Sequence, residues 1–244
     1  MFETSIRSKA RRAGRGLGIP LWLAALYLWP GVACAAQAER IVQFHIATKT
    51  EPVVITKVTL GNVVVQAGRW AKPIGTAPDP MTPFQADDDW VGNLTVCVLN
   101  RTTRGRVVYM SMHFSFPETG DGRTTPRYMY ALTLGRVPSA AAFENGRPLR
   151  LPVDSKPISF GPGQVLAVSL DNYISGIQPH VPLATLTKMT IDFGLVYFAD
   201  GLRWGGGYRM PDSQTLTWRR MGPDYFPGDM DWIWPGSPGW SDQQ

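Results

Sequence analysis

The sequence is poor in cysteine, which excludes a fold held together by disulfides. It has two cysteines, and Cys34 lies within a segment that we expect to be removed on export. Cys97 is then alone and cannot form an internal disulfide. Cys97 also lies inside a predicted strand and not beside a predicted base, so an inert buried thiol is favoured over a catalytic one.

Histidine is scarce as well, and the sequence contains no HExxH or CxxC motif. The three histidines are His45, His113 and His180. The first two share a predicted strand face with polar residues, Gln43 beside His45 and two serines beside His113. That placement is typical of a sheet surface rather than of zinc ligands. The run Asp87–Asp89 is the densest group of carboxylates, but adjacent side chains of an extended chain point apart, which disfavours a calcium site. We therefore expect neither a metal ion nor another cofactor.

The usual local signatures of catalysis are absent. The sequence has no GxSxG nucleophile motif and no Walker loop. Carboxylate pairs that hydrolyse glycosides are defined by their separation in space, so the sequence leaves them open. We expect a protein that is not an enzyme, with a hydrolase lacking a local motif as the remaining alternative.

The first 38 residues have the features of an export signal. Basic residues precede an apolar run from Leu17 to Trp29, and small residues at Ala33–Ala35 and Ala36–Ala38 fit signal-peptidase sites. Five of the 24 Lys and Arg residues and one of the 19 Asp and Glu residues lie in this leader, so the remainder holds 19 basic and 18 acidic residues. The basic character of the chain belongs mostly to the leader and does not predict binding to nucleic acid or to a membrane surface.

Three alternatives for the leader stay open. A lipobox ending at Cys34 would place a lipid there, although Gly31 occupies a position that normally holds leucine. A twin-arginine signal at Arg11 lacks the apolar residues expected after it. An uncleaved anchor would be short and interrupted by Pro20 and Pro30. We therefore expect a secreted or periplasmic protein with no membrane span after cleavage.

Alternation of apolar and polar side chains predicts strands along most of the chain. The clearest strand is 107–116, whose predicted core face carries Val108, Met110, Met112, Phe114 and Phe116. Further strands are predicted at 41–48, 53–66 with a turn at Gly61–Asn62, 90–100, 128–134, 166–170 and 189–197. The one helical candidate, 171–188, is interrupted by two prolines, so at most one short helix is expected. The pattern predicts an all-β, antiparallel β-sandwich of Ig-like or jelly-roll-like type.

Two predicted turns define how neighbouring strands should pair. Residues 101–106 are expected to join the strands on either side as a hairpin, with Gly105 supplying a positive φ. A second turn at 200–201 is expected to be two residues long and to place Tyr197 opposite Trp204 as a cross-strand aromatic pair.

Parts of the sequence resemble known domains. The segment 93–100, its turn and residues 106–109 resemble strand pairs of bacterial Ig-like or fibronectin-like domains, and 161–170 resembles a strand entry common in that class. Residues 40–220 as a whole are similar to a type of secreted bacterial protein with no assigned function. The resemblance implies a β-sandwich and no particular activity.

The C-terminal 24 residues differ in composition from the rest. Residues 221–244 hold eight Gly or Pro residues, four aspartates and no Lys or Arg, which is typical of a segment that does not fold alone. We therefore divide the chain into a signal peptide at 1–38, a single β-sandwich domain at 39–220 and an acidic, Pro/Gly/Trp-rich tail at 221–244. Whether the tail moves freely or docks stays open.

Arginine and aromatic residues supply the candidates for a binding surface. Arg101, Arg104 and Arg106 cluster at the predicted hairpin tip, but arginine outnumbers lysine 18 to 6 throughout the chain, so the cluster is weak evidence for an anion site. The predicted ligand-binding residues are Trp204, Tyr208 and Trp218. Three glycines after Trp204 leave open space beside it, as in surfaces that stack on sugars, whereas the alternative is that Trp204 anchors the core.

These observations predict a secreted, non-catalytic binding module, or one associated with the cell envelope, with an unknown protein or polysaccharide partner. The alternative function is a carbohydrate-binding domain that uses the aromatic surface near Trp204 and Tyr208. No nucleic-acid partner is expected.

The leader gives a first testable prediction. We expect signal peptidase to cut after Ala35 or Ala38, because small residues lie at the required positions behind the apolar run. N-terminal sequencing of exported protein should therefore begin at Ala36 or Glu39. A chain that still begins at Met1, or one that carries a lipid on Cys34, would contradict the prediction.

Overall fold

Short β-strands make up most of the described chain. The computed structural model describes residues 37–44, 50–68, 81–103, 105–120, 127–144, 146–148, 156–212, 214–222 and 225. Residues from Ala35 onward form one compact unit, to which the description is confined. The strands form two main sheets with one short helix, which confirms the predicted all-β sandwich.

The elements follow one another with short connections. The strands are β1 (Ala38–Phe44), β2 (Val53–Leu60), β3 (Val63–Ala67), β4 (Phe84–Ala86), β5 (Leu94–Asn100), β6 (Val107–Phe116), β7 (Tyr128–Gly135), β8 (Phe143–Glu144), β9 (Arg147–Pro148), β10 (Val165–Ser169), β11 (Lys188–Phe198), β12 (Arg203–Trp204), β13 (Tyr208–Asp212) and β14 (Thr217–Arg220). The helix is α1 (Ile174–Ile177), with single 3-10 turns at Pro117–Thr119, Ser139–Ala141, Asp171–Tyr173 and Leu183–Thr185.

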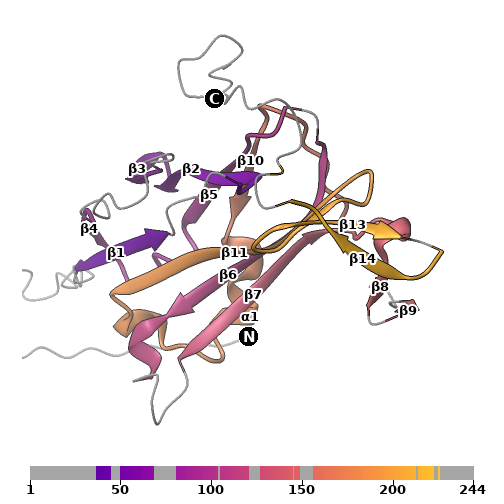
Figure 1. Ribbon diagram of the computed structural model, residues 1–244. Helices are drawn as coiled ribbons and strands as arrows, with labels where there is room; N and C mark the ends of the chain where they lie inside the picture. The colour runs from indigo at the N-terminus through magenta and orange to yellow at the C-terminus, as the bar shows by residue number, and fades with distance from the viewer. Residues whose placement is uncertain are drawn as a thin grey trace, which may run out of the picture. The chain divides into compact units, whose positions relative to one another are not determined.

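Strand β11 organises the larger, eight-stranded sheet. One edge of β11 pairs with β6, which in turn pairs with β7. The other edge pairs first with β1, in parallel, and further along with β12, which leads to β13 and β14. Figure 1 shows the result, with β1 and β4 at one end of β11 and β13 and β14 at the other. The parallel β1–β11 pair is the one departure from the predicted antiparallel pairing among the described strands.

The smaller sheet has four strands in the order β10-β5-β2-β3, and Figure 1 shows it on one side of β11 and β6. The core lies between the two sheets, because apolar side chains of both belong to one buried cluster. Val96 and Val98 come from the smaller sheet, Met112 and Phe114 from the larger, and Trp90 just before β5 is fully buried among them. Burial of such side chains is the main source of stability.

The alternation predicted for β6 is confirmed at four of its five positions. Met110, Met112, Phe114 and Phe116 are fully buried, but Val107 and not Val108 occupies the first core position. The reason is an irregularity in the pairing of β6 with β11, where Tyr197 lies opposite Tyr109 but the next residue lies opposite Val107. A bulge adds one residue on one strand and so reverses which side chains face the core.

The predicted hairpin at 101–106 is wrong. β5 pairs with β2 and β10, whereas β6 pairs with β7 and β11, so the connection crosses from one sheet to the other. Gly105 does not have a positive φ. Its role is to allow close approach, since a Cβ there would lie 2.4 Å from the ring of Phe198.

Polar side chains inside this crossover make it rigid. The Asn100 side chain donates to the carbonyl oxygens of Gly105 (2.7 Å) and Phe160 (3.1 Å). Its carbonyl oxygen accepts from the backbone N–H and the hydroxyl of Thr102 (3.1 and 2.7 Å). Buried polar groups are tolerated when they are hydrogen-bonded in this way. The sequence therefore correctly indicates a turn at 101–106, but this turn connects two strands of different sheets and not the two strands of a hairpin.

The turn after β11 also differs from its prediction, by one residue. Phe198 N–H donates to the carbonyl oxygen of Leu202 (2.9 Å), so the loop has three residues and not two. The longer loop shifts the register and places Tyr197 opposite Arg203, while Val196 lies opposite Trp204. The predicted Tyr197–Trp204 pair is therefore not formed.

The chain stays packed beyond residue 220. Met221 N–H donates to the carbonyl oxygen of Tyr208 (2.9 Å), and the Tyr225 ring contacts the Tyr208 ring with centroids 5.4 Å apart. The rest of the predicted tail lies outside the described residues. Within the part of the chain that is described, no helix has the length and apolar character needed to cross a membrane.

The burial of β6 predicts a large difference between two adjacent positions. Phe114→Ala should lower the free energy of unfolding by ~3–5 kcal/mol, because the Phe114 side chain is fully buried. Ser115→Ala should change it by less than ~0.5 kcal/mol, because Ser115 lies on the opposite face. Urea denaturation measures both variants, and equal midpoints would contradict the assigned register.

Candidate functional site

A surface pocket of about 440 Å³ lies between the turn that follows β4 and the segment that precedes β11. The polar residues that line it are Asp88, Asp89 and Gln178. An apolar wall is formed by the segment 181–184, which holds Val181, Pro182, Leu183 and Ala184. A mostly apolar hollow with a few polar groups at its rim is the usual form of a ligand site.

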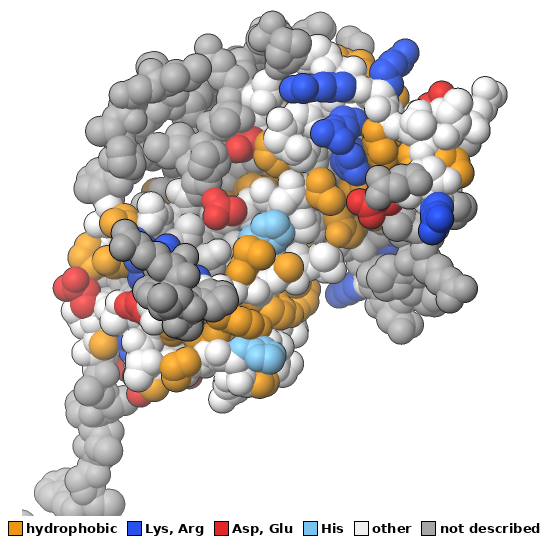
Figure 2. Space-filling model, turned by 60° about the horizontal axis from the view of Figure 1, so that its bottom comes forward, with side chains coloured by type: hydrophobic (Ala, Val, Ile, Leu, Met, Phe, Trp, Pro, Cys, Tyr) orange, Lys and Arg blue, Asp and Glu red, His pale blue; other side chains and the backbone are white. Residues whose placement is uncertain are grey.

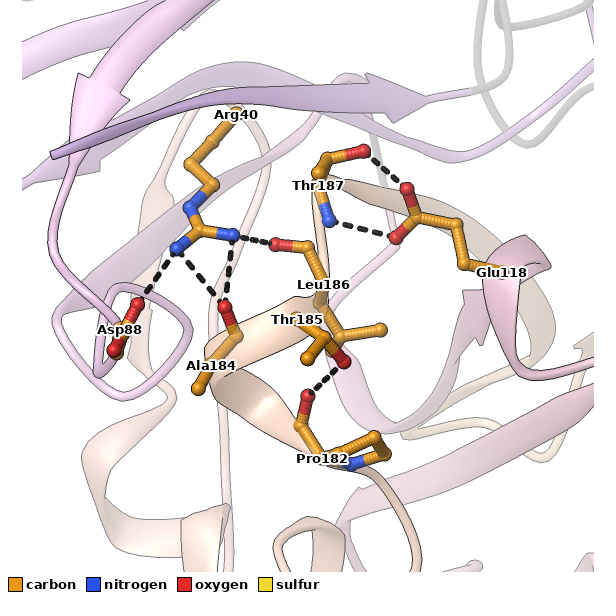
Figure 3. Close-up of polar contacts among 8 residues, drawn as sticks. All are labelled: Arg40, Asp88, Glu118, Pro182, Ala184, Thr185, Leu186 and Thr187. Atoms are coloured by element: carbon orange, nitrogen blue, oxygen red, sulfur yellow. Dashed lines mark hydrogen bonds and ion pairs between the residues drawn. The ribbon is translucent and has the colours of Figure 1, made fainter. Parts of the chain in front are cut away.

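Arg40 connects the two segments that line the pocket, because it bonds to Asp88 and to Ala184. Its side chain is only 1 % exposed, and its guanidinium bonds to Asp88 Oδ1 at 3.0 Å. The same guanidinium donates to the carbonyl oxygens of Ala184 (3.4 Å) and Leu186 (Figure 3). Arg40 is placed for this because β1 runs parallel to the start of β11, where Ile41 N–H donates to the carbonyl oxygen of Thr187 (2.7 Å).

Glu118 binds the chain just beyond the segment 181–184, where it leads into β11. It follows β6 in a 3-10 turn, and its carboxylate accepts from the backbone N–H (2.6 Å) and the hydroxyl of Thr187 (Figure 3). It also accepts from the backbone N–H of Lys188 (3.1 Å). A cation therefore binds carbonyl oxygens at 184 and 186, and a carboxylate binds amides at 187 and 188. Charge-assisted hydrogen bonds of this kind are stronger than neutral ones, so the wall of the pocket is fixed before any ligand arrives.

The two aspartates that line the pocket differ in whether they form an ion pair. Asp88 is paired with Arg40 even though 66 % of its side chain is exposed. Asp89 also lines the pocket and has no ion-pair partner among the residues described. The two carboxylates come from adjacent residues on one side, so they do not face each other across a bond as the acid and base of a glycosidase do. The arrangement favours binding of a cationic group.

The predicted aromatic platform is not at the surface. Trp204 is 5 % exposed and Tyr208 is 2 % exposed, and both belong to the buried core. The expectation that they stack on a sugar is therefore wrong for these two rings, and the alternative of core anchors holds. Gly206 and Gly207 leave open space, whereas a Cβ at Gly205 would lie 2.6 Å from Leu195. Trp204 itself is buried in the core, so this space does not expose its ring.

Trp218 is the predicted residue that stays partly exposed. Its ring lies 5.0 Å from the ring of Phe143 and 6.1 Å from that of Tyr197, between centroids. The guanidinium carbon of Arg203 lies 4.0 Å from the Trp218 ring centroid, which is a cation–π contact. The structure therefore places Trp218 beside Arg203. It does not place Trp218, Trp204 and Tyr208 together on one surface.

Arg101 is buried rather than exposed at a hairpin tip. Its side chain is 1 % exposed, and its Nε donates to the carbonyl oxygen of Glu51 at 2.6 Å. Burial lowers the pKa of Arg101 to about 10, while the charges of Glu51 and Tyr208 oppose that change. The Tyr208 pKa is raised, mainly by burial. Arg104 lies outside the described residues, and Arg106 is exposed and bonds to Ser159. The predicted arginine cluster is therefore not one surface.

Nucleophiles and metal ligands in the described part of the chain do not form a reactive group. Burial raises the pKa of the Cys97 thiol, which lowers its reactivity. The Ser111 hydroxyl accepts from Leu195 N–H (2.7 Å), and no hydrogen bond between it and His113 is present in the described structure. No group of three or more His, Cys, Asp or Glu side chains in that part could hold a metal ion. His180 is exposed and stacks on Tyr128, and His45 lies outside the described residues.

No protein-family model matches the chain, and no curated protein or solved structure is significantly similar to it. The resemblance of residues 40–220 to secreted bacterial Ig-like proteins thus stays a prediction. A function for the chain has to be argued from the geometry of its surface.

The contacts of Arg40 predict unequal effects of removing each partner of the ion pair. Arg40→Met should lower the free energy of unfolding by ~2–4 kcal/mol, because the carbonyl group of the buried Leu186 loses its donor and Ala184 and Asp88 lose a partner. Asp88→Asn should cost less than ~1 kcal/mol, because Asp88 is mostly exposed. Denaturation in urea compares them, and a larger loss in Asp88→Asn would show that Arg40 does not fix the wall.

Proposed function

We propose that the protein is an exported, non-catalytic binding module that takes a cationic group with an apolar stem into the pocket beside Asp89. The observation that carries the proposal is the apolar wall 181–184, whose last residue, Ala184, is bonded to Arg40, while Glu118 binds the chain just beyond the wall, at Thr187. Export is supported by the leader at 1–38 and its two signal-peptidase sites. A rigid wall lowers the entropy cost of binding, because few groups have to be ordered when the ligand arrives.

The lining of the pocket defines the chemistry of the ligand. Val181, Leu183 and their neighbours offer an apolar surface to an aliphatic stem. The Asp89 carboxylate offers a partner to an ammonium or guanidinium group, whereas Asp88 is already occupied by Arg40. A lysine side chain of a protein partner has both features, with a methylene stem and a charged end.

A series of small probes tests this function. We expect hexylamine to shift the amide NMR signals of residues 88–89 and 181–184 and to bind more tightly than hexanol, with hexanoate weakest, because the three share a stem and differ only in head-group charge. Asp89→Asn should weaken hexylamine binding by about fivefold, which corresponds to the loss of one exposed ion pair.

Asp87→Asn is the matched control, since Asp87 is an exposed neighbour that does not line the pocket. It removes the same charge from the same turn and should leave the affinity unchanged. Equal losses in the two variants, or equal binding of the three probes, would contradict a cation site in this pocket.

A further inference from the structure

Three arginines form a row across the ribbon of β12, β13 and β14. Arg203 lies directly opposite Arg209, and Arg209 lies directly opposite Arg220. Directly opposite residues of antiparallel strands place their side chains on the same face. Since neighbouring strands are about 4.8 Å apart, the Cβ atoms of the three arginines follow one another across the ribbon at steps of roughly 5 Å.

The row has no acidic counterpart within the described structure. Arg209 and Arg220 are exposed, and neither they nor Arg203 form an ion pair with an acidic residue among those described. Like charges directly opposite one another destabilise a sheet, so this ribbon carries an arrangement that folding alone does not favour. Figure 2 shows basic side chains gathered on the right, the side on which Figure 1 labels β13 and β14.

The first arginine of the row is held in place. Arg203 lies over the Trp218 ring at 4.0 Å, and its Nη1 donates to the Tyr197 hydroxyl at 3.5 Å. Trp218 is in turn packed against Phe143 and Tyr197. The cluster orients the guanidinium of Arg203, and it leaves the indole engaged with its neighbours.

We propose that the face of the β12–β14 ribbon that carries Arg203, Arg209 and Arg220 binds an acidic polysaccharide through its carboxylate groups. The planar guanidinium matches a carboxylate with two parallel hydrogen bonds, and successive sugars of a linear polymer present such groups in a row. A single-stranded nucleic acid fits less well, because its bases need free aromatic rings and Trp218 is already packed. This surface is separate from the pocket, so neither proposal depends on the other.

The ribbon offers a matched pair of variants for the test. Arg219 and Arg220 are adjacent and both exposed, but Arg219 lies opposite Met210 and so belongs to the other face. Arg220→Ala and Arg219→Ala therefore remove the same charge from the same strand on opposite sides. Titration of the exported protein with polygalacturonate by calorimetry, with neutral dextran as the uncharged polymer, measures their effects.

We expect Arg220→Ala and Arg209→Ala each to weaken polygalacturonate binding by roughly tenfold, and Arg219→Ala to change it by less than about twofold. The slope of log affinity against log salt should become shallower for the first two variants only. Without ligand, the thermal midpoints of Arg220→Ala and Arg209→Ala should not fall, because each substitution removes repulsion between like charges. An unchanged midpoint also shows that the variant is folded.

Three results would overturn the proposal. The first is an equal loss of affinity in Arg219→Ala and Arg220→Ala, which would mean attraction by net charge alone. The second is equal binding of dextran, or no binding of polygalacturonate by the unmodified protein. The third is tighter binding of single-stranded DNA than of polygalacturonate at the same ionic strength, which would assign the row to nucleic acid.

Discussion

The close approach of β6 to β11 at Gly194 is the contact on which the larger sheet depends. A Cβ at Gly194 would lie 2.5 Å from Ser111 Oγ and 2.7 Å from the His113 ring, so a side chain there would displace the Ser111 or His113 side chain. The ladder is irregular between Phe193 and Val196, and Leu195 N–H donates to the Ser111 hydroxyl (2.7 Å) instead. A side-chain oxygen thus satisfies an amide that the bulge removes from the ladder.

This irregularity lets one long strand serve two partners along the same edge. β1 pairs with β11 at 188–191, before the bulge, and β12 pairs with it at 196–197, after the bulge. The two proposed binding surfaces lie at these two ends. The pocket wall leads directly into the start of β11, where Arg40 of β1 reaches it, and the arginine row begins on β12, one turn after β11 ends. The strand that organises the fold therefore also separates the two surfaces.

The sequence predicts the fold class well because alternation reports burial directly, as Met110, Met112 and Phe114 show. Pairing partners are harder to predict, since a turn signal such as 101–106 does not distinguish a hairpin from a crossover between sheets. The prediction of an exposed Trp204 is wrong for a related reason, because an aromatic ring beside glycines can lie on either face of a strand. The roles of Arg40 and Glu118 have no local signal, because their partners are 146 and 69 residues away.

The central claim is that the two ends of β11 carry two independent binding surfaces. The most direct measurement is an amide NMR titration with hexylamine in the absence and presence of saturating polygalacturonate. We expect the shifts at 88–89 and 181–184 and the affinity for hexylamine to be the same in both, with polygalacturonate shifting the signals of β12–β14 alone. Displacement of one ligand by the other, or shifts at the same residues with both, would contradict the account.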